Sequence, residues 1–165
     1  MTYNPLNILR RRARAKGFGV HSPFAYKFIT EVLSEHLSYY DYDKLSDRCD
    51  RTLYRIAVFF RPHSIYSTRA GDAKAIFMAC VHAGKADVES CDMAVFSDAC
   101  DVEAMVKCIR RQCNIILIGN ARDALSSLKE LLQETQRGML FDNTKDLCVI
   151  VPNHKLPCQN FELKF

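Results

Sequence analysis

The segment HSIYSTRAGDAK places a small-residue loop, Ser67–Gly71, between a short apolar stretch and a helical pattern. Asp98, Asn120 and Asp142 stand directly after, or at the end of, three further apolar stretches. In an open α/β sheet, ligands bind beyond the carboxyl ends of the strands. A carboxylate there can accept hydrogen bonds from both hydroxyls of a ribose, and an amide can form hydrogen bonds with the edge of an adenine. We therefore predict a nucleotide-type cofactor site formed by Ser67, Gly71, Asp98 and Asn120, with Asp142 pointing into the same crevice.

Each of these residues also has a purely structural interpretation. Asp98 lies close to the start of a helix that begins near Asp101, where a carboxylate can cap the first backbone N–H groups. Asn120 can be a turn residue, and Asp142 with Asn143 can form the turn into the next strand. The shared position of these residues at successive strand ends indicates a cleft more strongly than it indicates a reaction.

Strands and helices alternate in the C-terminal two thirds of the sequence. Strands separated by helices of ten or more residues imply crossover connections and a parallel sheet. The segment CNIILIGN is almost continuously apolar, which is typical of a strand covered on both faces. The predicted strands are 64–67, 93–97, 114–118, 138–142 and 147–151, and the predicted helices are 72–83, 101–111 and 122–134.

No helical pattern separates segment 147–151 from the last apolar residues, 160–165. We expect these two segments to pair as an antiparallel hairpin at the edge of the sheet. The predicted fold class is therefore α/β, with a doubly wound, mostly parallel, Rossmann-like sheet, an antiparallel C-terminal edge and an N-terminal helical extension.

The N-terminal extension contains two amphipathic helices. Ser22 is a good N-cap and Pro23 suits the first helical position, so one helix begins here. A second helix starts near Asp43 and ends at Pro62, with one apolar face formed by Leu45, Cys49, Leu53, Ile56 and Phe60. Each helix has one apolar stripe that must be buried, and the α/β unit is the expected partner. We divide the chain into an extension, 1–61, and a Rossmann-like domain, 62–165.

Composition limits the class of protein. The chain has 165 residues, of which 48% are hydrophobic and 25% charged, enough for a folded core. No apolar run approaches the roughly 20 residues that span a bilayer, and no apolar stretch of a signal peptide follows the N-terminus. We therefore expect a cytoplasmic protein without membrane contact.

The eight cysteines include no C-x-x-C pair. In a reducing compartment they are most simply buried thiols that act as small hydrophobic residues. Cys108 and Cys113 could combine with His154 and Cys158 into four ligands, but the spacing is not typical of zinc sites. The sequence therefore predicts no metal.

A basic run accounts for much of the net charge of +4 and consists of Arg10, Arg11, Arg12, Arg14 and Lys16. Such a run can bind a polyanion, or it can be the solvated face of a helix. The aromatic side chains that stack on single-stranded nucleic acid are not interleaved with it, which favours the solvated face.

Several segments resemble a known family. GFGVHSPFAYKFITEVL and YYDYDKL are similar to the N-terminal region of class I S-adenosylmethionine-dependent methyltransferases of Bacteroidetes-type bacteria. Further along the chain, NIILIGNARDALSSLKELL, GMLFDN and LPCQNFELKF resemble, in the same order, strands of small O-methyltransferase-like domains. The resemblance covers most of the chain and implies S-adenosylmethionine as cofactor, with a methyl acceptor that the sequence does not identify.

The resemblance implies roles for individual residues. Gly71 would be the last glycine of the cofactor loop, Asp98 the ribose carboxylate and Asn120 the residue near the adenine ring. Asp142 would lie near the methyl-transfer site. His21 would lie at the mouth of the cleft and contact the substrate.

The chain departs from the family at the cofactor loop, where a carboxylate and a first glycine are expected. Alignment from Pro62 puts Ser67 and Arg69 at these two places, and alignment from Gly71 puts Ile65 and Ser67 there. Arg69 also places a cation near the cofactor's sulfonium, which is unfavourable. Two hypotheses follow: a methyltransferase with an altered loop, or a non-catalytic methyltransferase-fold protein that binds or regulates, which could use Arg10–Lys16 to bind a polyanion.

Overall fold

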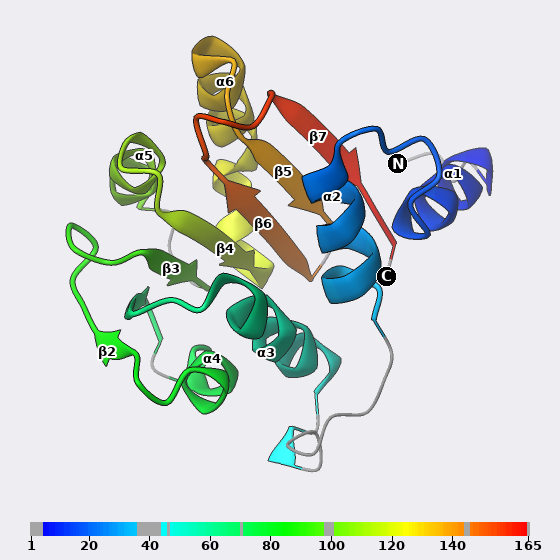
Figure 1. Cartoon of the computed structure of the whole chain (residues 1–165). Coiled ribbons are helices and arrows are strands. Elements are labelled where there is room, and N and C mark those ends of the chain that lie inside the picture. The colour runs from blue at the N-terminus through cyan, green and yellow to red at the C-terminus, as the bar shows by residue number, and fades with distance from the viewer. Residues whose placement is uncertain are drawn as a thin grey trace.

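A central sheet of seven strands separates two layers of helices (Figure 1). The computed structural model describes residues 5–35, 44–45, 47–69, 71–97, 101–143 and 146–164, apart from the side chains of residues 5, 120 and 122. The strands are β1 (Ser64–Ser67), β2 (Gly84–Lys85), β3 (Met93–Phe96), β4 (Asn114–Ile118), β5 (Met139–Asp142), β6 (Leu147–Val151) and β7 (Gln159–Glu162). The helices are α1 (Pro5–Ala15), α2 (Pro23–Lys27), η1 (Phe28–Leu33), α3 (Arg48–Phe60), α4 (Lys74–Ala79), α5 (Val102–Arg110), η3 (Gly119–Ala124) and α6 (Leu125–Thr135).

The strand order across the sheet is β2-β1-β3-β4-β6-β5-β7. Every pairing is parallel except those of β6, which runs antiparallel to both β4 and β5. The expected α/β class and mostly parallel sheet are therefore confirmed, as is an antiparallel component on the C-terminal side.

Two predicted details of the sheet are wrong. The segments 147–151 and 160–165 do not form a hairpin, because β6 pairs with β4 and β5 while β7 pairs in parallel with β5. The helix expected over 72–83 ends at Ala79, and Gly84–Lys85 then adds a short exposed strand beside β1. Two exposed residues carry no hydrophobic alternation, so this strand has no pattern by which the sequence could predict it.

Alternate residues of each strand face opposite helical layers. In β3, Met93 and Val95 belong to a core shared with α2, η1, α3 and α4, whereas Ala94 and Phe96 pack with α5 and α6. The strands β3, β5 and β6 are buried along their whole length. Their continuous apolar composition fits strands whose two faces are both covered by helices.

The N-terminal helices form part of one covering layer, as their apolar stripes predicted. Ser22 caps α2, with its Oγ accepting a hydrogen bond from the Ala25 N–H at 3.3 Å. Phe28 then packs against Phe141 of β5, with ring centroids 4.8 Å apart. The second helix, α3, begins at Arg48 rather than near Asp43, a residue outside the described part of the chain.

The basic run lies on and just beyond α1, which contacts β7 and η1. Arg11 donates a hydrogen bond to the Leu163 carbonyl at 3.0 Å, so one member of the run anchors the helix to the C-terminal segment. Arg10, Arg12, Arg14 and Lys16 are exposed. Among the described residues, no helix combines the length and the apolar character needed to cross a membrane.

A buried arginine joins α3 to the π-helix η1. The widened turn of η1 appears in the bond from Ser34 N–H to the Ile29 carbonyl, at 2.9 Å. Arg55, only 8% exposed, donates to the Val32 carbonyl at 2.6 Å and to Thr52 Oγ1 at 3.0 Å. Its guanidinium thus satisfies carbonyl groups that the end of a helix leaves without partners.

We expect Arg55→Met to lower the free energy of unfolding by about 2–3 kcal/mol, because charge-assisted hydrogen bonds are lost and a buried carbonyl keeps no equivalent donor. Urea unfolding of the purified protein measures this difference. The exposed Arg12→Met is the matched control and should change stability by less than about 0.5 kcal/mol. Equal stability of the two variants would show that Arg55 does not hold η1 against α3.

Candidate functional site

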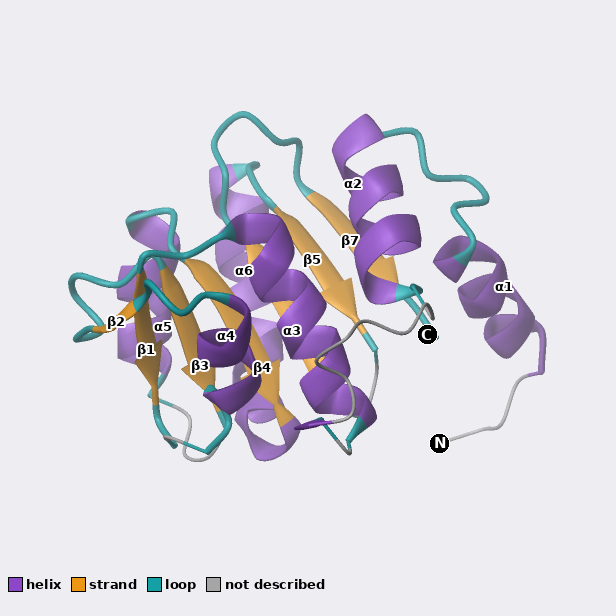
Figure 2. Cartoon of the chain, turned by 60° about the horizontal axis from the view of Figure 1, so that its bottom comes forward, coloured by secondary structure: helices purple, strands orange, loops and turns teal. Residues whose placement is uncertain are grey.

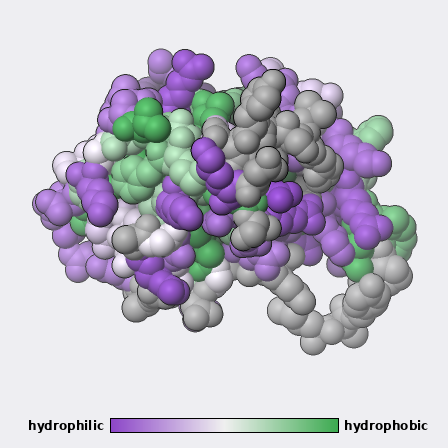
Figure 3. Space-filling view, turned by 90° about the horizontal axis from the view of Figure 1, so that it is seen from below, coloured by the Kyte–Doolittle hydropathy of each residue, from purple (hydrophilic) through white to green (hydrophobic). Residues whose placement is uncertain are grey.

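A cleft of about 510 Å³ opens at the carboxyl ends of the strands. In Figure 2, the arrows of β1, β3, β4 and β5 point toward this edge, and α3 begins there. Hydrophilic side chains predominate on the described surface seen from below (Figure 3). The cleft is lined by Asp47, Arg48, Cys49, Asp50, Thr52, Leu53, Asp72, Ile118, Gly119, Asn143, Asp146 and Leu147.

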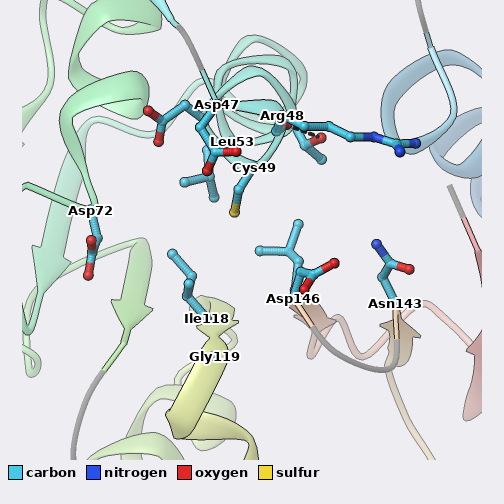
Figure 4. Close-up of a pocket in the computed structure, with 12 residues that line it drawn as sticks. Asp47, Arg48, Cys49, Leu53, Asp72, Ile118, Gly119, Asn143 and Asp146 are labelled. Atoms are coloured by element: carbon cyan, nitrogen blue, oxygen red, sulfur yellow. Dashed lines mark hydrogen bonds between the residues drawn. The ribbon is translucent and has the colours of Figure 1, made fainter.

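The first turn of α3 forms one wall of the cleft. Asp47 is the N-cap residue, with extended backbone angles, and its carboxylate makes no capping hydrogen bond. The Cys49 thiol projects from α3 toward Ile118, whereas the Arg48 guanidinium points away from the centre (Figure 4). Leu53 lies one turn beyond Cys49 on the same face and is buried in the core. The helix therefore presents a thiol and carboxylates to the cleft and anchors them through its apolar face.

The opposite wall comes from the ends of β4, β5 and β6. Gly119 follows β4 with φ of +53°, a left-handed conformation that favours glycine, and its N–H donates to the Asp146 carbonyl at 3.2 Å. Across β5 and β6, the Asn143 N–H donates to the Leu147 carbonyl at 2.9 Å. These backbone bonds fix the rim, so Asn143 and Asp146 face Cys49 across the gap (Figure 4).

Carboxylates dominate the electrostatics of the cleft. Burial, followed by the charges of Asp47, Asp50, Asp146 and Asp72, raises the pKa of Cys49 to about 12. Burial and then Asp47 also raise the pKa of Asp50, while Lys74 opposes this effect. Burial and these four carboxylates therefore keep Cys49 protonated at neutral pH.

The loop after β1 is tied to the end of β3. Thr68 donates its N–H to the Val95 carbonyl at 3.0 Å, and Thr68 Oγ1 lies 3.0 Å from Ser97 Oγ. Ser67 Oγ donates to the Arg69 carbonyl at 2.6 Å, within the same loop. Arg69 Nε lies 4.0 Å from an oxygen of Asp72, so the cation that departs from the family pattern stands beside a carboxylate of the cleft.

Gly71 has no steric reason to be glycine in this structure. A Cβ built at this position meets nothing within 4 Å, and its φ lies outside the left-handed region. Among the expected cofactor residues, Asp98 lies outside the described part of the chain. Asn120 belongs to η3, but its side chain is not described.

The structure separates the other two predicted residues from the cleft. Asp142, 5% exposed, ends β5 on the α6 side of the sheet, with Oδ2 4.0 Å from Lys129 Nζ. Its neighbour Asn143 lines the cleft instead. His21 precedes Ser22, the N-cap of α2. Phe24 of this helix packs near Phe59, at the far end of α3 from the cleft, with ring centroids 6.0 Å apart. His21 therefore lies toward the opposite edge of the sheet.

Sequence reasoning missed the carboxylates that give the cleft its charge. Asp47 and Asp50 flank Cys49 in SDRCDR, a cluster that the helical pattern explains as the polar side of an amphipathic helix. Asp146 belongs to the turn before β6, about 100 positions further along the chain. Only the packing of α3 over the sheet brings these residues together.

Comparison with protein-family models, curated proteins and solved structures gives no match to this chain. The geometry of the cleft and the resemblance of several segments of the chain are therefore the two indications of function. Within the described residues, the cleft carboxylates do not form a close set of three metal-ligating atoms.

We expect the double variant Asp47→Asn/Asp50→Asn to lower the pKa of Cys49, because two negative charges that oppose ionisation of the thiol are removed. Asparagine remains a good N-cap, so α3 should keep its start. At mildly alkaline pH, alkylation of Cys49 by iodoacetamide should accelerate about tenfold for each pKa unit by which it falls. Peptide mass spectrometry measures the rate at Cys49 alone. The double variant Glu130→Gln/Glu134→Gln, at two exposed positions, serves as the charge-matched control. An equal rate in both double variants would contradict a carboxylate-dominated cleft.

Proposed function

We propose that the cleft binds S-adenosylmethionine and that the chain is a Rossmann-like, S-adenosylmethionine-dependent methyltransferase-like protein of unidentified acceptor. The observation that carries the proposal is a carboxylate-lined cleft at the carboxyl edge of a mostly parallel sheet. This is the edge at which open α/β sheets bind their ligands. The resemblance of the N-terminal segments and of the strand segments supplies the identity of the cofactor.

The charge of the cleft matches the charge of this cofactor. S-adenosylmethionine carries a positive sulfonium and a positive ammonium group, against one carboxylate. Two opposite unit charges 4 Å apart attract by about 1 kcal/mol in water and by about 4 kcal/mol near a protein surface. Asp50, Asp72 and Asp146 therefore favour the cationic cofactor, and Arg48 on the rim is a candidate partner for its carboxylate.

The volume of the cleft supports a ligand of this size. About 510 Å³ falls within the range of roughly 300–1,000 Å³ that is usual for small-molecule sites. The partly exposed Ile118 contributes apolar surface, which suits an adenine ring or a thioether chain, and the buried Leu53 and Leu147 lie behind it.

A second candidate function is binding without catalysis, favoured by the position of Asp142. A general base must reach the proton that it removes, directly or through one water. Asp142 instead faces Lys129 on the other side of the sheet. Cys49, which does face the cleft, is kept protonated by burial and by the surrounding carboxylates, which raise its pKa to about 12. Such a protein would bind the cofactor as a regulatory ligand.

Calorimetric titration with S-adenosylmethionine and S-adenosylhomocysteine tests the proposal. We expect S-adenosylmethionine to bind more tightly, because S-adenosylhomocysteine lacks the sulfonium charge. Replacing one interacting carboxylate, in Asp72→Asn or Asp146→Asn, should lower the affinity for S-adenosylmethionine about tenfold, which is equivalent to about 1.4 kcal/mol of binding free energy. The same variants should change S-adenosylhomocysteine binding less.

Two further variants complete this experiment. Glu134→Gln removes an exposed charge from α6, outside the cleft lining, and should leave both affinities unchanged. Asp98→Ala tests the ribose carboxylate that the resemblance implies and should weaken both ligands alike. Absence of heat and of thermal stabilisation at millimolar ligand would exclude both candidate functions. Binding without methyl transfer to any tested acceptor would select the second.

The exposed part of the basic run supports one addition to the non-catalytic function, which is polyanion binding. Arg10, Arg12 and Arg14 project from α1 into solvent and would release counterions from a bound phosphate chain. Fluorescence anisotropy with a labelled single-stranded oligonucleotide should then show affinity that falls steeply with salt. Replacing Arg10, Arg12 and Arg14 together by Gln should reduce the slope of the logarithm of affinity against the logarithm of salt concentration by about two. A slope unchanged by the triple variant would assign the binding elsewhere.

A further inference from the structure

Three cysteines meet at the edge of the sheet opposite the cleft. Cys91 precedes β3, Cys108 lies in the last two turns of α5, and Cys113 directly precedes β4. Their sulfur atoms all lie within 4.8 Å of one another, and Cys91 Sγ is 3.5 Å from Cys113 Sγ. The exposed fractions of the three residues are 2%, 0% and 2%. This group, the three-thiol cluster, is the only set of three close metal-ligating atoms among the described residues.

The local fold explains why the three thiols converge. The turn after α5 bends back on itself at Gln112, whose φ is +61°, and the Cys113 N–H donates to the Cys108 carbonyl at 2.9 Å. The strands β3 and β4 pair in parallel, with Met93 opposite Asn114, so the residues before them share one edge. Cys91 and Cys113 therefore approach each other, and Cys108 covers them from the helix.

The other hydrogen-bond partners of the three thiols are backbone carbonyls. The Val88 carbonyl lies 3.6 Å from Cys91 Sγ and 3.9 Å from Cys108 Sγ, both long contacts for a thiol donor. The same carbonyl accepts a shorter bond, 3.0 Å, from Arg111 Nη1. The Asn114 carbonyl lies 3.5 Å from Cys113 Sγ. Among the described residues, the three sulfur atoms therefore contact one another and two backbone carbonyls.

We propose that Cys91, Cys108 and Cys113 form a three-thiolate site for a soft monovalent metal ion of the Cu(I) type. Thiolate is the ligand that selects soft ions. With a metal–sulfur distance of about 2.3 Å, a trigonal site places its sulfurs about 4 Å apart. This separation lies between the 3.5 Å from Cys91 Sγ to Cys113 Sγ and the 4.8 Å within which all three sulfur atoms lie.

Zinc fits the three-thiol cluster less well. Structural zinc requires four ligands, and a three-ligand zinc site keeps an open position for water or substrate. In the described part of the chain, no fourth histidine, cysteine or carboxylate joins the group, and all three thiols are buried. The combination with His154 and Cys158 that sequence spacing allows does not form, because His154 is bonded to Gln112 and Cys158 is not part of the cluster. A trigonal thiolate site needs neither a fourth ligand nor water.

Charge and access are both compatible with an ion in the three-thiol cluster. Three thiolates and one monovalent cation carry two negative charges. The Arg111 guanidinium lies beside the cluster, because it donates to the same Val88 carbonyl that contacts Cys91 and Cys108. The ion would replace the three thiol protons, which leave to solvent as the three sulfurs bind. Cys91 directly follows the exposed residues Glu89 and Ser90, so the three-thiol cluster lies next to the surface.

Copper loading of the full chain tests the proposal. Protein reduced and kept under anaerobic conditions is titrated with Cu(I) as its acetonitrile complex, in competition with a chromophoric Cu(I) chelator. We expect one tightly held ion per chain, and X-ray absorption should show three sulfur neighbours at about 2.3 Å. Each of Cys91→Ala, Cys108→Ala and Cys113→Ala should weaken binding by more than the roughly 10–100-fold that loss of a supporting residue costs.

Cys148→Ala is the matched control, because Cys148 is fully buried in the same core layer but lies outside the three-thiol cluster. It should leave the affinity for Cu(I) unchanged. The X-ray absorption spectrum of the unmutated protein gives the number of sulfur neighbours of the bound copper. This measurement does not depend on whether any variant folds. Two or four sulfur neighbours, tighter binding of Zn(II), or equal loss of affinity in Cys148→Ala would each overturn the proposal. A disulfide between Cys91 and Cys113 that persists after treatment with a reductant would do the same. The test does not involve S-adenosylmethionine, so its outcome is independent of the function proposed for the cleft.

Discussion

One face of the sheet is covered by helices that precede it in the sequence, and this burial is the constraint on which the structure depends. Phe28 of η1 contacts Phe141 of β5, which stacks on Phe161 of β7 with centroids 5.2 Å apart. Burial of each such side chain contributes roughly 1.5–3 kcal/mol. Without α2, η1 and α3, the apolar residues of fully buried strands would be exposed to water on that face. The extension and the α/β unit therefore share a single core.

The same burial creates the candidate site. Leu53 and Ile56 hold α3 across the strand ends, so its first turn projects over the end of β4. Arg55 links this helix to η1 and fixes its position further. Asp47 and Asp50 stand at the positive end of the helix macrodipole, where negative charge is stabilised. The macrodipole offsets part of the repulsion between these carboxylates. This is how the cleft can hold several negative charges close together.

The parts of the fold that the sequence could predict are those determined by local pattern. The strands β4 and β6 have the predicted bounds because each is a continuous apolar run, and α2 begins at its predicted Ser22 cap. The pairing of β6 and β7 was not predictable in this way, because hydrophobic pattern does not specify which neighbour a strand takes. The cleft carboxylates and the three thiols come from segments far apart in sequence. In both cases the residue types were visible, but the juxtaposition depended on the tertiary packing.

The two edges of the sheet differ in the kind of cation that they favour. The chain as a whole carries a net charge of +4, so long-range electrostatics oppose the approach of cations. Affinity for a cation must then be generated locally, and the structure does this in two chemically distinct ways. At the carboxyl edge, hard carboxylate oxygens line an open cleft and suit a dispersed, partly hydrated organic charge. At the amino edge, buried sulfurs suit a small polarizable ion that gives up its water. About 15 Å of strand separates the two edges, so the groups that line one site make no contact with a cation in the other.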